Sequence, residues 1–248
     1  MYKKICLGFS IIFSFLEDFF LKRNVPKSDL YINGYDFYCE ANSFFEKKIK
    51  KYRYIIDKKY QKLFIYDEKT LNEIVKIVFT KKFREYLTSQ TGFNYSIDFI
   101  SSYQNSHILE IDDNGNWYGN NFHFDKPYTK NMLKVMVPVY PIEDNDGPLS
   151  LFDKNSSNLY RKGLRLSGKR IKLIGKTGDK CLFLPNVCLH KADNPREGRS
   201  ATLIMFQLNP SSYWSINNKI TERQKYKEPK FPFFTYFFDK RYPMEKSV

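Results

Sequence analysis

The sequence NFHFDKP at residues 121–127 places two metal-binding side chains, His123 and Asp125, two positions apart. In an extended strand, side chains two positions apart project from the same face. The imidazole of His123 and the carboxylate of Asp125 can therefore converge on one ion, while Phe124 points the other way. This stretch predicts half of a metal site on a strand of a β-rich fold.

A second histidine completes the predicted site. The chain contains only three histidines, His107, His123 and His190, and the last of them follows the short apolar run 187–189. Two histidines and one carboxylate, with open positions opposite them, form the facial triad of non-haem Fe(II) oxygenases. His123, Asp125 and His190 are therefore the predicted metal ligands, and they indicate an iron-dependent oxygenase.

The chain around these ligands has the pattern of an all-β fold. From Phe93 onward, short β-prone runs are separated by turn residues, which is typical of sandwiches and barrels. The expected strands cover residues 95–104, 107–111, the stretch around 123–125, 132–140, 149–152, 171–174, 180–184, 187–189 and 201–208. Roughly eight strands in about 115 residues fit a double-sheet jelly roll. We therefore predict a mainly β fold with flanking helices, built on a double-stranded β-helix (cupin-like) core.

Helices are expected before this core. Residues 41–62 carry apolar side chains at helical spacing, with lysines on the opposite face. Thr70-Leu71-Asn72-Glu73 is a capping box, and the helix that it opens is expected to end before Gly92. Between residues 30 and 40, Asn33-Gly34 predicts a turn that leads into a short strand.

Length and composition favour one domain of 248 residues. Its 42% apolar residues, with 23 Phe and 19 Tyr, supply enough material for a single core. Within it we expect a mostly helical support at 1–92, a jelly-roll catalytic core at 93–210 and a C-terminal extension at 211–248 that packs on the core.

The two ends of the chain each leave an alternative open. Residues 5–16 are apolar apart from Gly8, Ser10 and Ser14, and they follow two lysines, but no small-residue cleavage site follows and the run is short for a membrane span. A core-packed helix is expected there, with a membrane anchor as the alternative. The basic tail from Trp214 contains the aromatic run 231–238, which we expect to pack irregularly on the body. A surface that stacks nucleic-acid bases is the alternative.

The four cysteines, Cys6, Cys39, Cys181 and Cys188, show no CxxC pairing. Reduced thiols in a cytoplasmic protein are expected rather than disulfides.

The net charge of +14 is unevenly distributed. Residues 93–160 hold 4 Lys/Arg against 9 Asp/Glu, whereas residues 161–199 hold 11 against 3. The basic excess lies beside the predicted site, where it would attract an anionic small-molecule substrate. A solubilising, lysine-rich surface is the alternative. A nucleic-acid or membrane partner is not expected.

A family resemblance follows from the order of these motifs. His123-x-Asp125, the run NDGPL at 145–149, Gly178-Asp179 before an apolar strand, His190 and then Arg199 resemble the Fe(II)- and 2-oxoglutarate-dependent dioxygenase superfamily. Within it, the chain is most similar to the phytanoyl-CoA dioxygenase-like branch. The resemblance covers about residues 93–208.

The resemblance implies Fe(II) as the metal, with 2-oxoglutarate and O₂ as co-substrates. It also implies hydroxylation of a small molecule, with release of succinate and CO₂. Arg199, nine residues after His190, matches the position of the arginine that holds the far carboxylate of 2-oxoglutarate, and a guanidinium can bind a carboxylate bidentately. Ser200 and Thr202 are candidates for a supporting hydroxyl, since the usual Arg-x-Ser pattern meets Ala201 here.

Four further residues are candidates for contact with the substrate: Tyr103, His107, Trp117 and Phe122. Three other functions remain open. The chain is alternatively a jelly-roll metalloprotein of other chemistry, such as a cupin-type isomerase or a dioxygenase without 2-oxoglutarate, a nucleic-acid-directed demethylase of the same superfamily, or a non-catalytic binding module. Binding of 2-oxoglutarate, of oligonucleotides and of metal, respectively, would distinguish them.

Overall fold

The computed structural model of the chain describes residues 28–40, 43–108, 118–125, 129–225 and 239–244, with residues 12, 14–16, 18 and 19. Its helices are α2 (Asp29–Asn33), α3 (Ser43–Ile49), α4 (Glu68–Val78), α5 (Lys81–Thr91), α6 (Lys154–Arg161) and α7 (Ile220–Arg223), with 3-10 turns η2 (Tyr118–Asn120) and η3 (Asp144–Asp146). Its strands are β1 (Tyr35–Tyr38), β2 (Tyr54–Lys58), β3 (Gln61–Ile65), β4 (Asn94–Asn105), β5 (Leu133–Pro138), β6 (Leu149–Leu151), β7 (Ile171–Leu173), β8 (Lys180–Phe183), β9 (His190–Ala192), β10 (Thr202–Ser211), β11 (Ser215–Asn217) and β12 (Arg241–Pro243). Within these ranges, no helix is long and apolar enough to cross a membrane.

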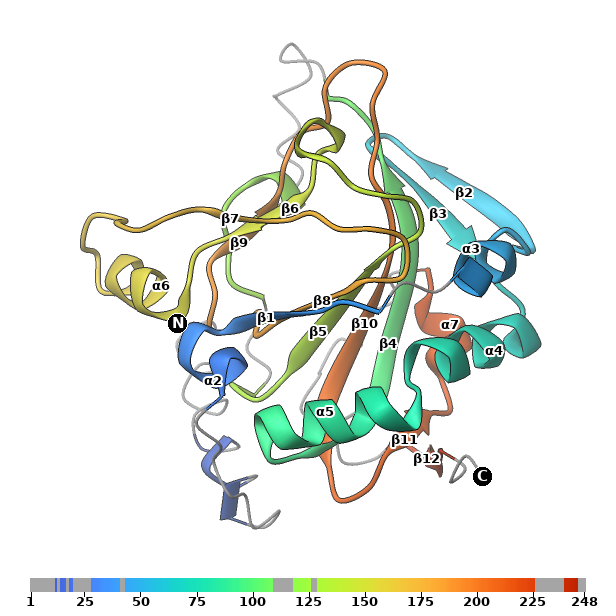
Figure 1. The fold of residues 1–248 in the computed structure, drawn as a ribbon, viewed down its shortest axis with the longest axis horizontal. Helices are drawn as coiled ribbons and strands as arrows, with labels where there is room; N and C mark the ends of the chain where they lie inside the picture. The colour runs from blue at the N-terminus through green and yellow to red at the C-terminus, as the bar shows by residue number, and fades with distance from the viewer. Residues whose placement is uncertain are drawn as a thin grey trace.

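The larger of two sheets combines strands from both halves of the chain (Figure 1). Its strands β1, β8, β5, β10 and β4 lie in that order, and each pairs antiparallel with the next. The far edge of β4 is covered by β3 at one end and by β11 at the other. The hairpin partner β2 and the last strand β12 extend these two ends.

The smaller sheet has the order β7, β6, β9 and is extended by a bridge between His123 and His190. Its buried side chains Leu151 and Leu173 pack in one cluster with Met136 and Met205 of the larger sheet, so the apolar space between the sheets is a shared core. Two sheets that pack in this way form the double-stranded β-helix, and the predicted fold class is confirmed.

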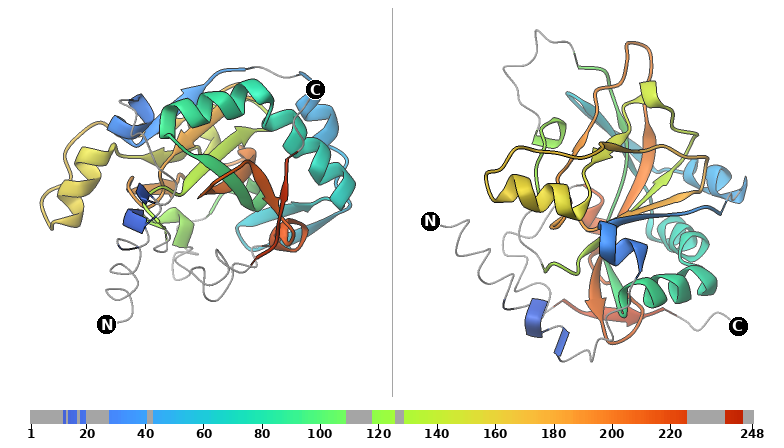
Figure 2. Two further views of the ribbon diagram at one scale, coloured as in Figure 1. Left: turned by 90° about the horizontal axis from the view of Figure 1, so that it is seen from below. Right: turned by 60° about the vertical axis from the view of Figure 1, so that its left-hand side comes forward.

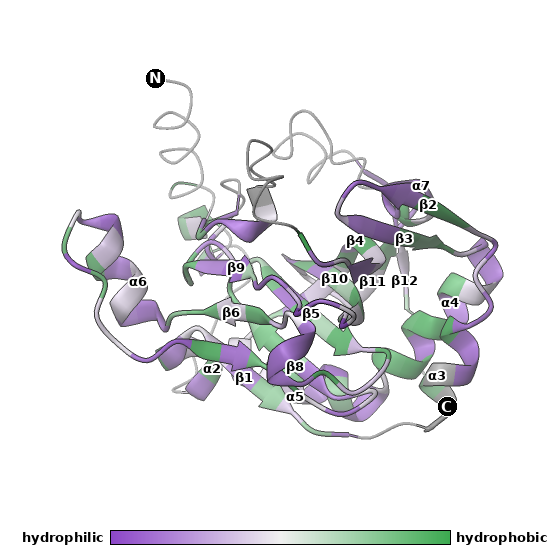
Figure 3. Ribbon diagram, turned by 90° about the horizontal axis from the view of Figure 1, so that it is seen from above, coloured by the Kyte–Doolittle hydropathy of each residue, from purple (hydrophilic) through white to green (hydrophobic). Residues whose placement is uncertain are grey.

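A second apolar cluster lies on the outer face of the larger sheet. Helices α4 and α5 cover this face (Figure 2). Buried residues of both helices, including Ile74 and Phe83, pack with Ile204, Phe206 and Leu208 of β10. Hydrophobic and hydrophilic residues both occur along α4 (Figure 3), as its half-buried position requires. The expectation of helices packed on the core is met by this pair.

The helix predicted at residues 41–62 is wrong beyond its first part. Only α3 forms, and residues 54–65 form the β2–β3 hairpin. Along β3, buried and exposed side chains alternate, and Phe64 pairs with Ser102 of β4. The apolar spacing in this stretch fits either a helix or a strand, and the open edge of β4 decides for the strand.

The predicted capping box is also corrected. Helix α4 begins earlier, because the side chain of Asp67 accepts a hydrogen bond from the amide of Thr70 at 2.7 Å. The predicted single helix is two helices, since Thr80 starts α5 by accepting from the amide of Phe83 at 3.3 Å. Its end at Gly92, with φ 76°, is as predicted.

The turn predicted at Asn33-Gly34 is confirmed. Gly34 has φ 84° and its amide donates to the carbonyl of Leu30 at 2.9 Å, after which β1 begins. A Cβ at this position would clash with the sulfur of Cys188, so both the backbone angle and the space require glycine.

Most of the predicted core strands match β4, β5, β6, β7, β8 and β10. Of the strand predicted at 107–111, His107 and Ile108 lie outside any strand and the remainder lies outside the described residues. The strand predicted at 187–189 is wrong, because the amide of Cys188 closes a turn onto the carbonyl of Leu184 at 2.8 Å and β9 starts only at His190.

Two predictions on the ends of the chain fall largely on undescribed residues, namely 5–16 and the aromatic run 231–238. The division into support, core and extension stays a prediction. Of the described cysteines, Cys181 and Cys188 are buried and Cys39 is exposed.

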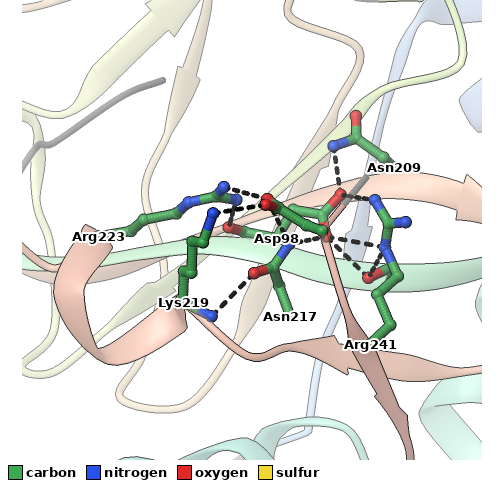
Figure 4. A network of polar contacts seen from close by, with 8 residues as sticks. Asp98, Asn209, Asn217, Lys219, Arg223 and Arg241 are labelled. Atoms are coloured by element: carbon green, nitrogen blue, oxygen red, sulfur yellow. Dashed lines mark hydrogen bonds and ion pairs between the residues drawn. The ribbon is translucent and has the colours of Figure 1, made fainter. Parts of the chain in front are cut away.

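The described part of the C-terminal region is tied to the sheet through one buried carboxylate, Asp98 of β4 (Figure 4). Its two oxygens accept hydrogen bonds from Asn209 at 2.6 Å, from Asn217 at 3.2 Å and from the guanidinium of Arg241 at 3.3 Å. Its backbone carbonyl accepts from Arg223 at 2.7 Å. The side chain of Asp98 therefore joins β4 to β10, β11 and β12, and its backbone carbonyl joins β4 to α7.

Replacing Asp98 by alanine should lower the free energy of unfolding by about 3 to 5 kcal/mol, because Arg241 and the two amides lose their shared buried acceptor. Urea denaturation followed by circular dichroism measures this. Asp57→Ala, at an exposed position of β2, is the control and should change the value by less than about 0.5 kcal/mol. Equal effects of the two substitutions would show that the network does not stabilise the fold.

Candidate metal centre

The two histidines are brought together by backbone pairing. The amide of His123 donates to the carbonyl of His190 at 2.9 Å, and the amide of His190 donates to the carbonyl of His123 at 3.0 Å. This antiparallel bridge places the imidazole centroids 4.5 Å apart. The segment that carries His123 is thereby fixed against β9.

Each imidazole is oriented by a carbonyl oxygen. Nδ1 of His123 lies 2.6 Å from the carbonyl oxygen of Asn121, and Nδ1 of His190 lies 3.0 Å from that of Cys188. A carbonyl only accepts hydrogen bonds, so both Nδ1 atoms carry protons and both Nε2 atoms are available as ligands.

Asp125 completes the cluster. Its Oδ1 lies 3.3 Å from Nε2 of His190 and 3.8 Å from Nε2 of His123. Its amide donates to the carbonyl of Pro185 at 3.2 Å, which holds the segment in place. The three ligand atoms all lie within 4.8 Å of one another. The structure thus brings together the three predicted metal ligands.

The protonation of the cluster suits a cation. Burial opposes ionisation of Asp125, but the ammonium of Lys134 and the contact with His190 outweigh it and hold the pKa of this carboxyl well below its usual range. Burial, together with the neighbouring His190, lowers the pKa of His123. An ionised carboxylate and a neutral imidazole are the forms that bind a metal at neutral pH.

A cavity of about 460 Å³ opens beside the cluster, and the three ligands line it. Apolar side chains form much of its wall, among them Phe99, Met136, Leu149 and Met205. Its size falls within the range of small-molecule sites.

Among the described residues, the charged side chains that line the cavity are three lysines and one carboxylate, namely Lys58, Lys59, Lys134 and Asp125. Gln61 and Gln207 add further polar groups.

The structure places only some of the predicted substrate residues at the cavity. Tyr103 lines the cavity. His107 binds the carbonyl of Pro195 through Nδ1 at 2.7 Å, and Phe122 packs on Phe152 with centroids 5.3 Å apart; neither lines the cavity. Trp117 lies outside the described residues.

Arg199 lies away from the cavity wall. Its Nε donates to Asp146 at 2.7 Å and its NH2 donates to Glu143 at 2.8 Å, and 47% of its side chain is exposed. Ser200 accepts a hydrogen bond from Gln104 at 2.9 Å on the surface. Thr202 shares the β10 face of Ile204, which belongs to the outer cluster, so its side chain points away from the cavity. None of these three lines the cavity as the structure places them.

Sequence reasoning missed the cavity lysines. Lys134 lies on β5, opposite Gln207 of β10, and alternates with the buried Leu133 and Val135. A lysine that interrupts an apolar strand was the available signal. Lys58 and Lys59 were assigned to a helix, and only the β2–β3 hairpin places them at the cavity.

The donor set fits a divalent transition metal. Two neutral imidazoles and one carboxylate are the ligands of the facial triad, and imidazole suits iron, nickel, copper and zinc alike. For 2-oxoglutarate, the fit is partial, because among the described residues no arginine lines the cavity and the nearby cations are lysines.

Comparisons with known proteins found similarity in structure but none in sequence. No protein-family model and no curated protein sequence matches the chain. The non-heme alpha ketoglutarate dependent epimerase SnoN from nogalamycin biosynthesis superimposes with a TM-score of 0.52 at 10% identity, over 79% of this chain and 83% of that one. EctD from S. alaskensis, with 2-oxoglutarate and 5-hydroxyectoine, gives a TM-score of 0.50 at 13% identity, over 76% and 78% of the two chains. At such low identity, these similarities show a shared jelly-roll fold.

Alanine at Asp125 or at His190 should abolish stoichiometric binding of Co(II), because two remaining ligands do not complete the site. Isothermal titration of the metal-free protein measures the loss, and circular dichroism checks that the fold is intact. His107→Ala removes the histidine that lies outside the cluster and should leave Co(II) binding unchanged. Retained binding in both ligand variants would show that other residues hold the metal.

Proposed function

We propose that this protein is an Fe(II)- and 2-oxoglutarate-dependent oxygenase that acts on a small molecule. The observation that carries the proposal is the cluster of His123, Asp125 and His190 at the wall of a small-molecule cavity in a jelly roll. Structural neighbours with the same fold support it, since one is described as alpha ketoglutarate dependent and another contains 2-oxoglutarate. Within the superfamily, the motif order favours the phytanoyl-CoA dioxygenase-like branch.

The residues of the chain have distinct roles in this proposal. His123, Asp125 and His190 would hold the iron on one side and leave its other positions to ligands from the cavity. With iron, 2-oxoglutarate and O₂ bound, the site would supply oxidation of a substrate C–H bond, coupled to release of succinate and CO₂. Apolar wall residues such as Phe99 and Met205 limit the water around the reacting groups.

Hydroxylation is the outcome that we propose. One of the structural neighbours is an epimerase, so the same fold also carries other outcomes.

The far carboxylate of 2-oxoglutarate needs a cation. Arg199 stays the candidate that the resemblance implies, but it would have to leave Glu143 and Asp146 to reach the cavity. Lys58 and Lys59 line the cavity already, and Lys134 lines it with its ammonium bound to Asp125.

The position of Arg199 favours one second candidate function. A jelly-roll metalloprotein of other chemistry, such as a cupin-type enzyme, would need the metal ligands but no arginine for 2-oxoglutarate. In that case the protein would bind Co(II) and would not bind 2-oxoglutarate.

The substrate is proposed to be anionic. Three lysines and one aspartate among the described lining residues give the cavity an excess of positive charge, and a bound divalent metal would increase it. Lys58, at the end of β2, and Lys59, in the turn of the hairpin, are exposed and also line the cavity.

Purified protein with Fe(II), ascorbate and O₂ should convert 2-oxoglutarate to succinate, slowly without substrate and faster with a true substrate. Succinate is measured by mass spectrometry. Asp125→Ala is the control and should reduce succinate release to the level of free iron, because the carboxylate ligand is lost. Absence of both succinate and 2-oxoglutarate binding in protein loaded with iron would refute the proposal.

Glutamate at both Lys58 and Lys59 should reduce the stimulation of succinate release by anionic compounds at least tenfold, mainly through a higher KM, since the charge at the cavity is reversed. Lys62→Glu, on β3 and outside the cavity lining, is the control and should have little effect. Equal stimulation by neutral and anionic compounds in the unmodified protein would exclude an anionic substrate.

A further inference from the structure

The two oxygens of the Asp125 carboxylate lie close to different groups. Its Oδ1 faces the two imidazoles, at 3.3 and 3.8 Å from their Nε2 atoms. Its Oδ2 lies 2.5 Å from the ammonium of Lys134. The side chains of Lys134 and Asp125 are only 14% and 15% exposed, so water screens this ion pair weakly.

The backbone of Lys134 is held firmly in the larger sheet. Strand β5 lies between β8 and β10, and Lys134 pairs with Phe183 on one side and with Gln207 on the other. Its neighbours Leu133 and Val135 are fully buried in the outer cluster. The ammonium therefore approaches the metal ligands from a fixed strand rather than from a loop.

The ion pair changes the net charge of the group of side chains that would surround a metal. Two neutral histidines and one carboxylate carry a formal charge of −1, whereas the same set with Lys134 is neutral. A divalent cation is then attracted less strongly to the site. Once bound, it keeps more of its positive charge available to an anionic ligand in the cavity.

Lys134 also occupies one oxygen of Asp125. A carboxylate whose Oδ2 is bound to an ammonium offers only Oδ1 to the metal. This leaves more coordination positions open on the cavity side than a carboxylate that binds through both oxygens.

We propose that Lys134 is a positioning residue that weakens the binding of the metal and strengthens the binding of the anionic 2-oxo acid to the metal. The inference rests on the proposed function and adds to it a residue outside the three ligands. Both effects come from the same ammonium, so they change together and in opposite directions when the charge is removed.

The test uses Co(II), which occupies the site without turnover. Metal-free protein is titrated with Co(II), and the loaded protein is then titrated with 2-oxoglutarate, both by calorimetry. Lys134→Met should bind Co(II) roughly tenfold more tightly or better, and should bind 2-oxoglutarate roughly tenfold more weakly or worse. The visible absorption of bound Co(II) should change as well, because Asp125 gains the freedom to bind through both oxygens.

Two further variants serve as controls. Lys134→Arg keeps the positive charge and should stay closer to the unmodified protein in both titrations. Lys172 forms an ion pair of the same 2.5 Å length with Asp144, outside the cavity lining, and Lys172→Met should change neither titration. If Lys134→Met does not fold, Lys134→Gln removes the same charge with a polar side chain and takes its place.

The outcomes separate the two proposals. Weaker binding of both Co(II) and 2-oxoglutarate in the uncharged variants would show that Lys134 only supports the structure, and unchanged binding would show that it has no role; either result overturns the inference alone. Failure of the unmodified protein to bind Co(II), or to bind 2-oxoglutarate once loaded, would overturn the proposed function and the inference with it.

Discussion

The candidate site depends on two backbone hydrogen bonds between His123 and His190. They join a segment without regular structure to the first residue of β9, across more than sixty positions of sequence. Because the bridge is antiparallel, it sets the distance between the imidazoles. Asp125, two residues further on, then falls within reach of both. The site is therefore a product of strand pairing, and the sheets around it keep that pairing in register.

The cluster of candidate metal ligands could be predicted from the sequence because the geometry of two of its members is local. His123 and Asp125 need only an extended backbone between them, and the scarcity of histidine left few candidates for the third ligand. The eight or so core strands were readable for a similar reason, since turn residues separate them. What the sequence leaves open is which strands become neighbours. The cavity wall is assembled from neighbouring strands, so most of its residues were not predictable.

Two parts of the chain show this limit in particular residues. Residues 54–65 have a spacing that suits a helix, and they form a hairpin because the edge of β4 accepts β3. Arg199 was expected at the cavity from its distance to His190, but Glu143 and Asp146 lie beside it and bind its guanidinium. Those partners are more than fifty residues away in sequence. Local pattern carries no information on either contact.

The β2–β3 hairpin lies at the edge of the larger sheet. Its strand β3 pairs with the last residues of β4, whereas the candidate metal ligands belong to other segments, on the smaller sheet and beside it. Yet it supplies two of the cavity lysines, Lys58 at the end of β2 and Lys59 in the turn. Leu63 and Ile65 of β3 are buried in the cluster between the sheets, whereas Lys58 and Lys59 are exposed, so the two lysines can be replaced without removing a core side chain. The two exposed lysines and the three candidate metal ligands come from separate parts of the chain, so a substitution in one set leaves the other in place.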